Sequence, residues 1–397
     1  MFYRSILHHR QFRYLGAFYL HSIVRLFAVS IFQIFSSIYI YQSLRGYGTE
    51  TPQALALTSL FFALTFLVHA LSIAPSLWLI NKKGLRFSVF WGNIFLIGFF
   101  LLLYLGKFDP IFFIIAAVLG GLQIGLYWTA YHIYFAELSD DSKQGEEIGI
   151  SVSLSAIASI GGPAFGGLLI GYAGFGATFL VMTILIGLAV LPLKYLPKQK
   201  DIISIDILQT VLALAPKKEA RSYFALFGFA VIDLVGGSFW PLFVFPALAG
   251  FIGVGFMGSL VALVATVTTI TTGFVIDRLG VKKVLNVLSS LDSLTWIIKS
   301  FVVTPLHIFS VAGISAFTTA GQMMSVDTLV YERARHENLV AYIVQREVGL
   351  ALSKFIFLLL MGILFWFGLP LVFIFVMAAL AALGTRLYPE EPLATIK

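Results

Sequence analysis

The sequence predicts an all-α integral membrane protein with twelve transmembrane helices in two pseudo-symmetric six-helix bundles. Three observations predict this fold: a composition that is 59% hydrophobic and only 11% charged, a series of long apolar segments, and a basic turn that occurs twice. An ordinary soluble domain has about 25% charged residues. A soluble protein with so few charges could not cover its surface, so we expect the chain in a lipid bilayer.

The apolar segments are long enough to cross the bilayer. A span needs roughly 20 mostly apolar residues to cross about 30 Å of hydrocarbon. The spans must be helical, because lipid offers no partner to a free backbone N–H or C=O group. The twelve predicted spans begin near Leu15, Leu55, Phe87, Ile111, Ile148, Gly176, Tyr223, Phe251, Val284, Leu306, Tyr342 and Leu369.

The longest polar connection lies between the sixth and seventh predicted spans and divides the chain almost in half. It predicts a cytoplasmic linker at 198–221 between an amino-terminal six-helix bundle at 1–197 and a carboxy-terminal six-helix bundle at 222–397.

The basic residues predict the orientation of the chain. With the amino terminus inside, only Arg45 and Lys107 fall in outside loops, and Lys and Arg are enriched in cytoplasmic segments of membrane proteins. We therefore expect both termini in the cytoplasm and the chain in the plasma (inner) membrane. The net charge of +7 is attributed to this orientation, not to nucleic-acid binding.

The residues and motifs that several kinds of chemistry require are absent from this sequence. The absence of cysteine excludes disulfides, thiolate metal sites and thiol catalysis. The sequence has no G-x-x-x-x-G-K-[ST], H-E-x-x-H or G-x-S-x-G motif, so neither ATP-driven transport by this chain alone nor membrane hydrolysis is expected. We expect no enzymatic activity, no cofactor and no metal site.

The two basic turns align residue by residue. Each follows the second span of its half, and a glycine permits the sharp reversal that a short helix–helix loop requires. The acidic Asp277 ends a helix, where its charge opposes the local dipole, so we expect it to have a partner from the other half. The turn residues are Asn81, Gly84 and Arg86 in the first copy and Asp277, Arg278, Gly280 and Lys282 in the second.

These turns resemble a motif of the major facilitator superfamily, and the likeness covers essentially the whole chain. The second turn is similar to the latter part of the family pattern G-x-x-x-D-R-x-G-R-R, whereas the first has Asn81 where the family usually has Asp. The segment GGPAFGG at 161–167 resembles the fifth-span G-P-x-x-G-G of proton-coupled exporters. The fourth-span arginine of such exporters is missing, and Gly120 lies near its place. The resemblance implies alternating access, in which two bundles rock about a central site.

Charges within the spans are candidates for that site, because each costs roughly 2.5–3.5 kcal/mol at mid-membrane. Arg25 shares a face of the first span with His21 and Gln33, and Asp233 shares a face of the seventh with Trp240. The resemblance implies a cavity lined by spans one, four, seven and ten, so Arg25 and Asp233 could face each other. Alternatively, each is satisfied inside its own half.

Further polar and aromatic residues extend the candidate cavity. In the fourth span Trp128, Tyr131 and His132 form a stripe that could either stack on a solute or pack between helices. In the tenth span Gln322 is expected in the cavity, whereas Asp327 either couples protons or pairs with Arg333 or another inner cation.

Three residues of the later spans leave their roles open. Lys354 could neutralise Asp233 or Asp292, in a coupling or a structural role. Asp292 and Lys299 share one face of the ninth span, which the family places at the periphery, so we expect a structural role for them.

Small residues in the fifth and eighth spans predict a close helix contact. Small residues let helix backbones approach within a bilayer, and Pro163 can bend its span. The resemblance implies that these spans meet at the interface between the halves. The expected interface residues are Gly162, Pro163, Gly166, Gly167, Gly255 and Gly258.

These features together predict a monomeric secondary transporter of a small organic solute, with protons as the expected coupling ion and a slight preference for efflux. The alternatives are a facilitative uniporter without ion coupling, a non-transporting sensor or scaffold on a transporter fold, and a channel. A cavity filled by side chains, with Arg25 and Asp233 buried apart, would favour the sensor.

Overall fold

The computed structural model describes residues 2–138, 144–196, 220–334 and 339–390, and these residues form helices without a strand. In the amino-terminal half the helices are α1 (Phe2–Gln33), α2 (Ser36–Gly46), α3 (Thr51–Lys83), α4 (Leu85–Leu105), α5 (Ile111–Leu138) and α6 (Gln144–Val190), followed by the 3₁₀ helix η1 (Leu191–Tyr195). In the carboxy-terminal half they are α8 (Ala220–Leu234), the π-helix η3 (Val235–Phe239), α9 (Trp240–Val244), α10 (Phe251–Leu279), α11 (Val281–Lys299), α12 (Pro305–Ala334), α13 (Leu339–Trp366), α14 (Phe373–Gly384) and the 3₁₀ helix η4 (Thr385–Leu387).

These helices account for the twelve predicted spans. The fifth and sixth spans both lie within α6, and the chain reverses between them at Gly174. The φ of Gly174 is 75°, a backbone conformation that glycine adopts without strain. The seventh span is built from three pieces, α8, η3 and α9. By length and composition, eight stretches of described helix are apolar enough to cross a bilayer, and one of them, Ser155–Tyr195, contains two spans.

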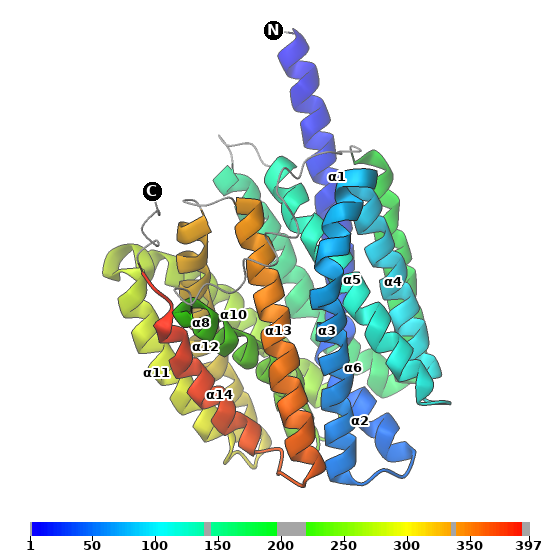
Figure 1. The fold of residues 1–397 in the computed structure, drawn as a ribbon, viewed down its shortest axis with the longest axis vertical. Helices are drawn as coiled ribbons and strands as arrows, with labels where there is room; N and C mark the ends of the chain where they lie inside the picture. Colours follow the sequence, from blue (N-terminus) through cyan, green and yellow to red (C-terminus); the bar gives the residue numbers. More distant parts are fainter. Residues whose placement is uncertain (1, 139–143, 197–219, 335–338, 391–397) are drawn as a thin grey trace.

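Two helix pairs join the halves. Helix α3 packs along α13, and α6 packs along α10, whereas most other contacts lie within one half. The second span thus meets the eleventh, and the fifth meets the eighth, as a twofold relation between the halves requires. Figure 1 shows α3 beside α13 along much of their length, with the first turns of α1 at one end of the molecule and α2 at the other.

The end of the molecule that carries α2 is closed by contacts between the halves. The Ser37 hydroxyl donates to the carbonyl of Ser238 at 2.5 Å. The ring of Phe251 contacts Phe35 and Phe175, with centroids 6.1 and 5.1 Å away. Aromatic packing therefore separates the interior of the molecule from this end.

The two basic turns have the same conformation. Gly84 has a φ of 94° and Gly280 a φ of 83°, and the N–H of each donates to the carbonyl four residues earlier. This confirms the predicted left-handed reversals. The aligned Arg86 and Lys282 also act alike, because each donates to carbonyl oxygens at the end of the last span of its own half.

The linker predicted at 198–221 lies outside the described residues up to position 219. Asp277 and Arg278 are exposed, and no partner of Asp277 lies within the described part of the chain. Asn81 lies at the end of α3 and is partly buried.

Candidate functional site

A cavity of about 290 Å³ lies between the two bundles. Helices α1 and α6 contribute one wall, and the seventh span together with α10, α11 and α12 contributes the rest. Most of the lining is apolar. Its polar residues are Ser30, Gln33, Ser159, Asp233, Trp240, Trp296, Lys299, Ser315 and Thr319. The predicted cavity residues Gln33, Asp233 and Trp240 therefore all line this cavity, Gln33 from α1 and the other two from the seventh span.

The seventh span is irregular where it meets the cavity. The π-helix η3 widens the helix at Gly236 and Gly237, and both glycines line the cavity. Single π turns inside a helix are frequent at functional sites. Asp233, before this turn, and Trp240, after it, both line the cavity.

Asp233 forms an ion pair with Lys354 of α13. The Lys354 Nζ donates to Asp233 Oδ2 at 2.6 Å, and the carboxylate side chain is 50% exposed against 18% for the lysine. Of the two acids that the sequence offered to Lys354, packing selects Asp233. The pair leaves part of the Asp233 carboxylate accessible from the cavity.

Arg25 lies inside the amino-terminal half, apart from this cavity. It is 2% exposed, its Nε donates to Asn93 Oδ1 at 3.2 Å, and its Nη2 donates to Gln123 Oε1 at 2.9 Å. The guanidinium carbon lies 3.3 Å from the centroid of the Tyr127 ring. Arg25 therefore does not face Asp233, because neutral groups and an aromatic face of its own half satisfy it.

His21 and Gln322, both expected in the cavity, are packed between helices and do not line it. His21 is fully buried, and its Nδ1 lies 2.6 Å from the carbonyl oxygen of Ala189. The amide of Gln322 donates to the Ala382 carbonyl at 3.0 Å and to Thr385 Oγ1 at 2.8 Å, so it joins α12 to the last span. Hydrogen bonds to the last span of the same half therefore fix the position of both side chains.

The aromatic stripe of the fourth span packs against α1 and belongs to a cluster that also contains Val344 and Val348 of α13. Tyr131 stacks on Phe18 with ring centroids 5.0 Å apart, and Trp128 stacks on His132 at 5.7 Å. All three residues of the stripe are partly buried. Of the two roles left open for the stripe, this geometry is that of helix packing.

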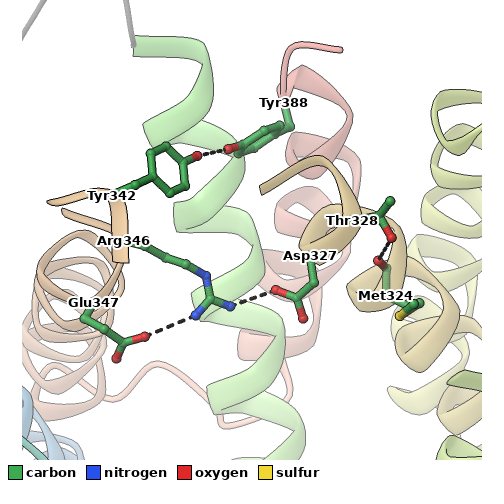
Figure 2. A network of polar contacts seen from close by, with 7 residues as sticks. All are labelled: Met324, Asp327, Thr328, Tyr342, Arg346, Glu347 and Tyr388. Carbon is green, nitrogen blue, oxygen red and sulfur yellow. Dashed lines mark hydrogen bonds and ion pairs between the residues drawn. The ribbon is translucent and has the colours of Figure 1, made fainter. Parts of the chain in front are cut away.

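A second ionic network lies where the last turns of α12 meet the first turns of α13. Figure 2 shows Arg346 of α13 between Asp327 of α12 and Glu347, with N–O distances of 2.7 and 3.1 Å. Beside it the hydroxyl groups of Tyr342 and Tyr388 form a hydrogen bond. Asp327 thus pairs with Arg346.

The small residues divide between two contacts. Backbone or proline atoms of Pro163, Gly167, Gly255 and Gly258 approach one another where α6 meets α10, between the halves. Gly162 and Gly166 were expected at this interface, but they do not lie there. A Cβ on Gly166 would lie 1.9 Å from the carbonyl oxygen of Ile31, and one on Gly162 would strike Ser30, so both glycines pack against α1 of the same half.

Lys299 and Trp296 line the cavity, although the sequence interpretation placed their span at the periphery. Lys299 is the last residue of α11, and its side chain leans back over Trp296 one turn earlier. The signal in the sequence was the spacing of Asp292, Trp296 and Lys299 on one face of a helix, which marks a polar stripe that a lipid-facing helix would not carry.

The sequence profile of the Major Facilitator Superfamily matches residues 18–232, more than half of the chain. The chain belongs to this superfamily. No curated protein matches it in sequence. The resemblance inferred from the two turns and the fifth-span glycines is thereby confirmed.

The fold is similar to those of solved transporters. A D-xylose–proton symporter structure aligns with 96% of this chain and 99% of its own, with a TM-score of 0.69 and 14% identity. A POT family transporter in complex with 5-aminolevulinic acid aligns over 94% of both chains, with a TM-score of 0.69 and 12% identity. Another POT family structure, in complex with a thioalcohol-conjugated peptide, gives a TM-score of 0.72 at 11% identity over 94% of both chains. The likeness shows the fold, a multi-pass membrane transporter, and with the family membership it supports secondary transport.

Proposed function

We propose that this protein moves a small organic solute across the membrane by alternating access, with protons as the coupling ion. The observation that carries the proposal is Asp233, which lies on the wall of an inter-bundle cavity and pairs with Lys354 of α13. An intramembrane carboxylate that is half exposed to a cavity can exchange its lysine partner for a proton or for a group on the solute. The two bundles would rock about this cavity, and the motion would occur at the α3–α13 and α6–α10 contacts between the halves.

The cavity favours a carrier over a sensor on the same fold. A sensor was expected to have a filled cavity with Arg25 and Asp233 buried apart. Arg25 is indeed buried apart from Asp233, but the cavity has open volume and the Asp233 side chain is half exposed. Open volume beside an accessible charge favours solute binding.

Facilitated uniport is the second candidate function. Lys354 already neutralises Asp233, so the pair is stable without a proton. In a uniporter the pair would only shape the cavity, and a pH gradient would not drive accumulation. In a coupled carrier the pair would open during each cycle.

The remaining parts of the proposal concern placement and direction. Both termini are proposed to be cytoplasmic in the plasma (inner) membrane, and the protein to act as a monomer. The fifth-span glycines and proline favour efflux, and the turns at Gly84 and Gly280 would act in gating. Transport in oriented vesicles tests the direction, because an exporter accumulates solute only in inverted vesicles.

The deciding experiment compares wild type with Asp233→Asn in liposomes under an imposed pH gradient. The proteoliposomes are loaded with a pH-sensitive dye and screened against sugars, carboxylic acids, amino acids and short peptides. We expect Asp233→Asn to abolish gradient-driven accumulation while remaining folded, because an amide cannot release a proton.

Asp109→Asn is the matched control, because Asp109 caps the start of α5 far from the cavity and an asparagine oxygen can accept the same hydrogen bond from the N–H of Ile111. Undiminished accumulation by Asp233→Asn would remove Asp233 from the coupling role. Solute counterflow that is insensitive to the pH gradient in wild type would establish the uniporter.

A further inference from the structure

Lys299 is a buried cation on the wall of the inter-bundle cavity. Its side chain is 3% exposed, although it is the last residue of α11. The Nζ atom lies 3.5 Å from the ring centroid of Trp296 and 4.9 Å from that of Trp240. Helical side chains lean toward the amino terminus of their helix, which directs this amine back between the two indoles.

The ammonium group of Lys299 has no hydrogen bond or ion pair within the described part of the chain. Asp292, the acid nearest to it along α11, is already satisfied by other donors. Its oxygens accept hydrogen bonds from Trp296 Nε1 at 2.9 Å, Thr318 Oγ1 at 2.7 Å and Thr319 Oγ1 at 2.5 Å. Asp292 therefore fixes the indole on which Lys299 rests, and the lysine keeps its own donors.

A second donor on the same wall is also unmatched. The Nε1 of Trp240 is buried and has no acceptor among the described residues. Buried donors are nearly always hydrogen-bonded in folded proteins, so two unmatched donors on one cavity wall predict a ligand that brings acceptors. The acid in the cavity, Asp233, already has Lys354 as its partner.

The rest of the lining predicts the body of the ligand. Beside the polar Ser30, Gln33, Ser159, Ser315 and Thr319, its larger part is apolar. It comes from the residue after α1 and from α8, α10 and α12, with the side chains of Ile34, Ile232, Met257, Val261, Ala312 and Met323. An apolar cavity with a few polar groups on one wall is typical of sites for small organic molecules. Asp292 balances the charge of Lys299 through space but accepts no hydrogen bond from it. The lysine donors therefore still need an acceptor, and the carboxylate group of a ligand would supply one.

We propose that this cavity binds a small organic carboxylate, whose carboxylate group contacts Lys299 and Trp240 while its apolar body lies against α10 and α12. This inference rests on the proposed function, since it names the class of solute that the cavity takes. It gives the ninth span a binding role that Asp292 and Trp296 support by holding the lysine in place.

Binding is tested on the purified full-length protein in detergent, where no transport is needed. The probes are acetate, hexanoate and phenylacetate, together with their primary amides, which have nearly the same shape without the charge. The readout is tryptophan fluorescence, because Trp240 and Trp296 flank the site. We expect saturable quenching by at least one of the longer carboxylates and at least tenfold weaker binding of its amide.

Substitutions then assign the site. Lys299→Met is expected to weaken carboxylate binding at least tenfold, whereas Lys299→Arg keeps it within a few-fold. Lys107→Met is the matched control, because Lys107 also lies over two aromatic rings, those of Tyr104 and Phe108, outside the cavity. Trp240→Phe keeps the ring and removes only the N–H donor, so it should weaken binding about fivefold even if Lys299→Met fails to fold.

The possible outcomes separate this inference from the proposed function. Equal binding of acids and amides, no binding of any of the three acids, or unchanged binding by Lys299→Met would overturn the carboxylate site, and coupled transport of other solutes could stand. Carboxylate binding that depends on Lys299, without flux in liposomes, would support the site and count against transport.

Discussion

Arg25 in the amino-terminal half is held by an asparagine, a glutamine and a tyrosine ring, whereas Asp233 in the carboxy-terminal half is held by a lysine. The arginine is 2% exposed and the aspartate side chain 50%. A buried charge with neutral partners is fixed by its surroundings, while an ion pair on a cavity wall can exchange partners. The two halves thus hold their intramembrane charges differently: neutral groups enclose Arg25, whereas Asp233 has a charged partner and an exposed side chain, which is why the proposed function assigns exchange to the Asp233–Lys354 pair.

The largest expected effect, because it combines a loss of coupling with a loss of stability, comes from breaking the Asp233–Lys354 pair. Lys354→Met leaves Asp233 unpaired within the bilayer, where an unpaired charge costs about 2.5–3.5 kcal/mol. We expect lower thermal stability and at least a tenfold loss of gradient-driven transport. The double variant Asp233→Asn with Lys354→Met should recover the stability but not the coupling, because no charge remains to be exposed or exchanged.

Unfolding temperature in detergent and solute accumulation in liposomes are measured for the same preparations. Full coupling in Lys354→Met would show that the pair is only structural and would remove the asymmetry between the halves.

The next largest effect comes from removing the enclosed charge of Arg25. Arg25→Met removes two hydrogen bonds from a charged donor, each worth about 1.5–3 kcal/mol, so stability should fall by about 3 kcal/mol or more. Arg25→Lys should also be destabilised, because an ammonium cannot reproduce the fork that reaches both Asn93 and Gln123. The folded fraction of each Arg25 variant should transport protons and solute in the same ratio as wild type.

Chemical unfolding and proton-to-solute stoichiometry check these two expectations for Arg25. A stable Arg25→Met protein with altered stoichiometry would place Arg25 in the transport cycle after all.

The spans and the turns could be predicted from the sequence because their information is local. The length of an apolar run sets a span, and a glycine between basic residues sets a reversal, as the φ values of Gly84 and Gly280 confirm. The π turn in the seventh span carries no comparable signal, because Val235–Phe239 reads as ordinary helix.

The partners of the intramembrane charges could not be predicted, because they depend on how each helix is rotated about its axis. Lys354 had two possible acids, and only the packing of α13 against α8 selects Asp233. The rotation of α11 likewise turns Lys299 toward the cavity, whereas analogy had placed this span outside. Adjacent residues such as Gly166 and Gly167 point about 100° apart on a helix and meet α1 and α10 respectively.

That difference predicts distinct effects for neighbouring glycines. Gly166→Ala should destabilise the protein by about 1–3 kcal/mol, because its Cβ would lie 1.9 Å from a backbone oxygen of α1 that cannot move freely. Gly161→Ala is the control, since its Cβ would meet only the Phe27 ring at 3.7 Å. Gly167→Ala, whose Cβ would strike the Phe251 carbonyl of the other half at 2.5 Å, should instead slow turnover.

Thermal unfolding and transport rate separate these two results. Equal losses of stability from Gly161→Ala and Gly166→Ala would show that the fifth span adjusts as a whole, and the close approach to α1 would then carry no cost.

The smallest expected effect compares the two basic turns. Arg86 donates to the carbonyl of Lys194 at 3.0 Å, whereas Lys282 donates to two carbonyls, those of Arg386 and Tyr388. With a net value of about 1 kcal/mol for each hydrogen bond, Lys282→Ala should cost more stability than Arg86→Ala. The two turns lie in separate bundles, so the double variant should show the sum of the two losses. Chemical unfolding of the three variants measures this, and a loss well above the sum would mean that the turns are coupled through the interface between the halves.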